Sequence, residues 1–137
     1  MGLPRMAGRI LGVLLISDPP EQSINDLSEA LQASKGSIST NTRLLSETGL
    51  IERVPSPVPR RVYCAFKDGG WLVFTRQRMC LMAEFHHIAE RGLEMLQDRD
   101  RALQERLQEG HHMFSMIEEH YPVLLDRFEE ERLAQRR

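Results

Sequence analysis

Cysteine is scarce in this chain, and so are the motifs that catalysis requires. The 137 residues include two cysteines, Cys64 and Cys80, which match neither a metal-binding spacing nor a disulfide framework. We interpret both as ordinary half-buried thiols, whereas a redox switch would need an exposed thiol of low pKa. A glycine-rich phosphate loop, a nucleophile elbow and a metal-binding dyad are missing as well. These absences predict a protein that is not an enzyme and needs no cofactor.

A long hydrophobic run is also missing. The apolar stretch near the N-terminus covers only residues 10–16, which is too short to span a membrane. Pro4 precedes this stretch, Asp18-Pro19-Pro20 ends it, and no small-residue cleavage site follows. We therefore interpret residues 4–17 as a core helix rather than a signal peptide, and expect a cytoplasmic protein with no membrane partner.

Neither sign of charge dominates the chain, whose 18 basic and 20 acidic residues give a net charge of −2. Residues 1–66 hold seven basic and six acidic residues, and residues 67–137 hold eleven and fourteen. The acidic half can point away from a nucleic acid while a local basic surface meets it. The small net charge predicts modest non-specific affinity, with specificity carried by a few contacts.

Helix signals recur through residues 1–66. Ser23 is a suitable N-cap for a second helix, with Asp26 at the third position beyond it, as in a capping box. Ser34 can cap a third helix that follows after a short turn, and Gly49 suits the left-handed residue after its end. Two short helices joined by such a turn form a helix-turn-helix.

A β-hairpin is predicted after the third helix. Residues 50–54 and 61–66 have strand character, and the proline-rich segment 55–59 between them can only be a loop. Arg60 and Arg61 follow this loop. The order helix, helix, helix, hairpin is that of a winged helix-turn-helix domain.

The third helix has an unusually small and polar outer face. Its inward positions are Ile38, Leu44, Leu45 and Thr48. Its outward positions are Lys35, Gly36, Ser39, Thr40, Arg43 and Glu47. Such a face suits a recognition helix in the major groove of DNA. By the helical wheel Asn41 turns inward, so a structural hydrogen bond is expected there, and the alternative is that it reads a base at the edge of the face.

Residues 68–137 predict long helices with wide apolar stripes. One helix runs from Trp71 and a second starts near Asp98 or Asp100, with Pro122 expected to kink or restart it. The chain has no third layer to cover the stripes, so a second copy is the expected cover. A two-fold dimer would also place two recognition helices about 34 Å apart, in successive major grooves.

The stretches 34–45, 49–54 and 60–63, together with the opening segment 2–12, resemble the GbsR branch of the MarR-type transcriptional regulators. The likeness covers about residues 1–72. It implies a dimeric bacterial regulator that binds a promoter and responds to a small ligand. It also implies that side chains of the third helix face DNA and that an arginine reaches it from the wing: Ser37, Ser39, Thr40, Arg43, and Arg60 or Arg61.

Each of these side chains has an ordinary alternative role. Arg43 can bond two acceptors on a guanine edge, or it can be a solvated surface arginine. Lys35 is unfavourable for the helix dipole in a first turn, so a nearby phosphate would explain it. Arg60 and Arg61 point to opposite faces if the strand begins there, so at most one is expected to meet DNA.

Other clusters admit two interpretations. Five histidines, His86, His87, His111, His112 and His120, suggest a metal site, but adjacent pairs diverge on a helix and we expect none. A stripe of aromatic and methionine side chains can line an effector pocket or simply form core. This stripe comprises Trp71, Phe74, Met79, Met82, Phe85 and Met95.

These observations predict a mainly α (α+β) protein. We expect a winged helix-turn-helix domain with a two-stranded wing over residues 1–67, followed by long dimerisation helices over residues 68–137. Its function would be sequence-specific binding of double-stranded DNA as a homodimer, more in keeping with a repressor. The predicted DNA contacts are Lys35, Ser37, Ser39, Thr40, Arg43, Arg60 and Arg61. The alternatives are a winged-helix module that binds protein and a helical ligand-binding protein without DNA binding.

Overall fold

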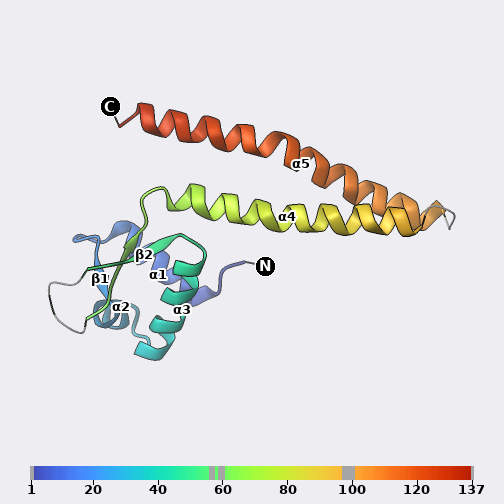
Figure 1. The fold of residues 1–137 in the computed structure, drawn as a ribbon. Helices are drawn as coiled ribbons and strands as arrows, with labels where there is room; N and C mark the ends of the chain where they lie inside the picture. Colours follow the sequence, from blue (N-terminus) through green and yellow to red (C-terminus); the bar gives the residue numbers. More distant parts are fainter. Residues whose placement is uncertain (1, 56–57, 59–60, 97–100, 137) are drawn as a thin grey trace. The chain divides into compact units, whose positions relative to one another are not determined.

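The computed structural model describes residues 2–55, 58, 61–96 and 101–136 (Figure 1). The elements in chain order are α1 (Arg5–Ile16), β1 (Gln22–Ser23), α2 (Ile24–Leu31), α3 (Lys35–Glu47), β2 (Ile51–Val54), β3 (Tyr63–Phe66), α4 (Gly70–Met95) and α5 (Arg101–Ala134). The chain divides into two compact units, Met1–Phe74 and Thr75–Arg137. The fold is mainly helical with a small antiparallel sheet, as predicted.

The core of the first unit joins its three helices to the sheet. Leucine and isoleucine side chains from each of these elements are fully buried or nearly so: Ile10, Leu14, Leu27, Ile38, Leu45, Leu50 and Ile51. Burying an aliphatic side chain of this size stabilises a fold by about 1.5–3 kcal/mol. This shared core fixes the underside of α3 and leaves its opposite face free.

Both predicted helix starts are confirmed. The Ser23 hydroxyl accepts from the Asp26 N–H at 3.1 Å, and the Asp26 carboxylate accepts from the Ser23 N–H at 2.8 Å. At α3, the Ser34 hydroxyl accepts from the Ser37 N–H at 3.2 Å. Each bond satisfies a backbone donor that has no partner inside the helix.

Two glycines set the path after α3. Gly49 has φ of 74°, the left-handed conformation predicted for it. A Cβ on Gly70 would lie 2.8 Å from the Leu50 carbonyl oxygen and 3.2 Å from that of Gly49. Only glycine therefore allows α4 to begin this close to the backbone that follows α3.

The sheet has one strand more than the sequence indicated. The predicted wing strands are present, shortened to β2 and β3, and they pair antiparallel with Arg53 opposite Cys64. The predicted two-stranded wing is confirmed, and in addition the two residues of β1 pair with β3, which gives the order β1-β3-β2. Two residues are too few to show strand periodicity. Through β1, the start of α2 lies beside the strand that returns from the wing.

The capping box makes the stability of the first unit depend on pH. The hydrogen bonds from the Ser23 hydroxyl and the Ser23 N–H lower the pKa of Asp26, with a smaller contribution from Arg61. A carboxyl whose pKa is lower in the folded state stabilises the fold above its unfolded pKa of about 3.9. That stabilisation is lost as the pH falls through the folded pKa.

We expect Asp26→Asn to lower the free energy of unfolding at pH 7 and to flatten its dependence on pH below about 4. The measurement is denaturant unfolding at pH 3–7, monitored by the fluorescence of Trp71. The ring centroids of Trp71 and Phe66 lie 5.3 Å apart. The companion variant Ser23→Ala should cost about 1 kcal/mol at pH 7. Parallel pH curves for Asp26→Asn and the wild type would contradict the assignment.

The second unit is a pair of long helices. Phe85 of α4 stacks on Phe114 of α5 at 5.6 Å, and a Cβ on Gly92 would lie 2.9 Å from Leu107. Arg76 forms ion pairs with Asp126 at 2.8 Å and with Glu129 at 3.2 Å. Apolar packing in the middle and ion pairs near the end therefore hold the two helices together.

Pro122 does not restart the helix, because α5 continues through it as one element of 34 residues. The expectation for the two cysteines was wrong. Cys80 was expected to be half-buried, yet it is exposed on α4, whereas Cys64 is buried in β3. Burial raises the pKa of the Cys64 thiol, with the charge of Arg53 opposing this. In the described part of the chain, none of the helices has both the length and the apolar character needed to cross a membrane.

Candidate nucleic-acid interface

Helix α3 presents the predicted polar face. Its inner side is anchored by Ile38 and Leu45, which are fully buried, and by Thr42, which is 5% exposed. The Thr42 hydroxyl donates to the Ser39 carbonyl at 3.0 Å, so its burial leaves no polar group unsatisfied. These buried side chains therefore anchor α3 to the core of the first unit.

The outer side of α3 is free of bulky apolar groups. Its exposed residues are Lys35, Gly36, Ser39, Thr40, Arg43 and Glu47. Ser37 is half-buried rather than exposed, and its carbonyl accepts from the Asn41 side-chain amide at 2.8 Å. The structural hydrogen bond predicted for Asn41 is thus confirmed, which removes it from the outer face.

Arg43 stands near the middle of this face with its guanidinium exposed. Among the described residues it has no ion-pair or hydrogen-bond partner. Small neighbours such as Ser39 and Thr40 leave room for a close approach on both sides. An exposed guanidinium with free donors can bond the two acceptors of a guanine edge or a phosphate.

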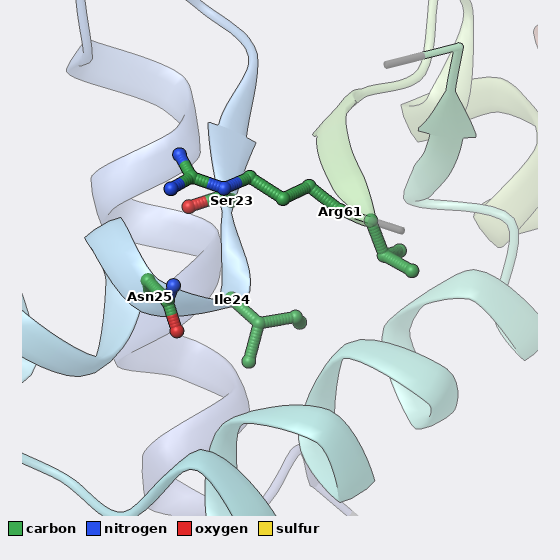
Figure 2. Close-up of a pocket in the computed structure, with 5 residues that line it drawn as sticks. Ser23, Ile24, Asn25 and Arg61 are labelled. Carbon is green, nitrogen blue, oxygen red and sulfur yellow. The ribbon is translucent and has the colours of Figure 1, made fainter. Parts of the chain in front are cut away.

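The wing supplies a second basic group. Arg61 is exposed and lies two residues before β3, and its charge contributes to the lowered pKa of Asp26. Its side chain extends across to the start of α2 (Figure 2). Arg60 and most of the wing tip, residues 56–57 and 59, lie outside the described residues. Asn25 lines a pocket together with Arg61, although no sequence pattern indicated Asn25 as a site residue.

The other predicted clusters do not form a site of their own. His86 and His111 come together, with ring centroids 4.6 Å apart, and His86 Nδ1 lies 2.6 Å from a Glu118 oxygen. Over the described ranges, no three histidine, cysteine or acidic side chains are arranged to hold a metal ion. Of the proposed effector stripe, Phe74 packs on the core of the first unit and Phe85 on Phe114.

A short capped helix, a turn, a second helix with an exposed polar face and a β-hairpin together define a winged helix-turn-helix protein. Comparisons with known proteins agree with this class. The MarR family model matches residues 1–62, and the model of MmpR5-like MarR family transcriptional regulators matches residues 69–131.

One relative is the HTH-type transcriptional regulator MmpR5 of Mycobacterium tuberculosis (strain ATCC 25618 / H37Rv). It is 40% identical over 116 residues, which cover 85% of this chain and 70% of that protein. The crystal structure of a transcriptional regulator matches with a TM-score of 0.79 and 37% identity, over 92% of this chain and 86% of that one.

The chain therefore belongs to the MarR family of transcriptional regulators. It is a DNA-binding protein of the winged-helix type and not an enzyme. The matches name the MmpR5-like group, and the GbsR branch stays a resemblance in the sequence alone.

Proposed function

We propose that this regulator binds a pseudo-palindromic operator as a homodimer in the cytoplasm and represses transcription from it. The supporting observation is the outer face of α3, which is polar, free of bulky groups and fixed by a buried underside. Residues 1–67 would bind DNA and residues 68–137 would pair the two copies. The proposed contacts are Lys35, Ser37, Ser39, Thr40 and Arg43 of α3, with Arg60 and Arg61 of the wing.

Pairing of two copies is supported by the apolar surface of the second unit. Twelve large hydrophobic side chains there are at least 37% exposed. They are Leu81, Phe85, Ile88, Met95, Leu103, Met113, Met116, Tyr121, Val123, Leu124, Phe128 and Leu133. An apolar surface of this extent is unusual on a monomer, and a symmetric partner would cover it.

A small-molecule effector would act by changing the geometry of the dimer. A ligand can shift the protein between a binding and a non-binding arrangement only if it binds one of them more tightly. Repression would then be relieved by a ligand that prefers the arrangement whose recognition helices do not fit successive grooves.

The test is selection of bound sequences from random duplex DNA by the purified protein. We expect a symmetric motif whose half-sites lie about one helical turn apart. Sedimentation of the same preparation should give twice the chain mass of 15.8 kDa. Failure to enrich any sequence at low salt would refute the proposal, and an asymmetric motif bound by a monomer would refute the dimer.

A further inference from the structure

A small hollow lies between the start of α2 and the residues that lead into β3. Its volume is about 170 Å³, and its lining is Ser23, Ile24, Asn25, Arg61 and Val62 (Figure 2). Residues 23–25 and 61–62 are distant in sequence and are brought together by the pairing of Ser23 with Tyr63. The hollow belongs entirely to the first unit.

Two polar side chains in this hollow, Arg61 and Asn25, are free to donate hydrogen bonds. The Ser23 hydroxyl and N–H are already used by Asp26. The side chains of Arg61 and Asn25 have no hydrogen-bond partner among the described residues. The guanidinium carries a full positive charge, and the Asn25 amide can donate two further hydrogen bonds. Such a lining suits an anion.

The carboxylate of Asp26 lies near this hollow, and its negative charge would repel an anion. This carboxylate is held by the N–H of Ser23 and does not line the hollow. Arg61 has the smallest pKa-lowering effect on Asp26, and no hydrogen bond or ion pair joins the two side chains among the described residues. The guanidinium donors of Arg61 therefore remain available to an acceptor on a ligand.

We propose that this hollow receives one phosphate of the DNA backbone, bonded by Arg61 and Asn25. The inference rests on the proposed function, because it assumes that the operator lies against α3. In helix-turn-helix proteins the first of the two helices crosses the backbone while the second enters the groove, and α2 is the first helix here. Ile24 and Val62 form apolar walls that leave no room for a base pair. Arg61 thus positions the protein on DNA and reads no sequence.

The test is the salt dependence of binding for Arg61→Gln, measured on the selected operator and on a random duplex. Each phosphate contact by a cation contributes about 0.9 to the slope of log K against log salt concentration. We expect the slope to fall by about 0.9 on both duplexes, with an equal loss of affinity on each. Arg61→Lys should keep the slope, and Asn25→Ala should lose affinity several-fold with the slope unchanged.

Arg5→Gln is the matched control, because Arg5 is exposed on α1 and is not among the proposed contacts. It should leave both slopes as in the wild type. If the wild type binds DNA but Arg61→Gln keeps the full slope, the phosphate site is refuted and the proposed function stands. If Arg61→Gln loses affinity for the operator but not for the random duplex, the phosphate site is also refuted, because Arg61 would then contact a base. If the wild type binds no duplex, the proposed function itself fails.

Discussion

Arg43→Ala is expected to weaken binding to the selected operator at least tenfold while the protein remains folded and dimeric. Arg43 is exposed on the outer face of α3, so truncating it removes no packing from the core. Losing a bidentate base contact costs about 1–3 kcal/mol, which corresponds to roughly five- to 150-fold in affinity. The measurement is an electrophoretic shift titration with the operator and with a random duplex of equal length.

The conservative variant Arg43→Lys separates a base contact from a phosphate contact. Lysine keeps the charge but lacks the planar fork, so it should retain binding to the random duplex and lose preference for the operator. Arg5→Ala is a matched control, because Arg5 is exposed on α1 and is not among the proposed contacts. Unchanged operator affinity in Arg43→Ala would show that Arg43 is only a solvated surface residue.

The parts of the fold that depend on neighbouring residues could be predicted from the sequence. The caps at Ser23 and Ser34 and the left-handed Gly49 each require a particular side chain at a particular place. The buried and exposed sides of α3 follow from helical periodicity, because the helix packs on one layer only. The structural hydrogen bond of Asn41, made to the Ser37 carbonyl, was expected from the same wheel.

The features that depend on distant residues could not be predicted in this way. Strand β1 exists because Gln22 and Ser23 meet Cys64 and Tyr63, about forty positions later in the chain. The hollow that joins Asn25 to Arg61 depends on this same pairing, so no local pattern could indicate it. Whether Pro122 ends a helix also depends on its surroundings, and α5 continues through it as one element.

Leu124→Glu is expected to separate the dimer and thereby reduce operator binding by more than the loss of any single DNA contact. Leu124 is 57% exposed in the single chain, and Phe128 lies one turn further along α5, 47% exposed. A charge here costs the isolated chain little, but it would be buried without a partner when two copies pair. A monomer contacts one half-site only, so its affinity falls towards that of a single winged-helix domain.

Sedimentation of this variant should give the chain mass of 15.8 kDa rather than twice that value. Gln135→Glu adds the same charge to an exposed polar position near the end of α5 and should leave the dimer intact. The neighbouring Leu125 is 7% exposed within the single chain, so Leu125→Ala should lower the unfolding free energy of the helical pair by about 2–5 kcal/mol. A Leu124→Glu protein that still sediments as a dimer would show that this stretch of α5 is not where the copies meet, and pairing would then involve other exposed apolar residues of the second unit.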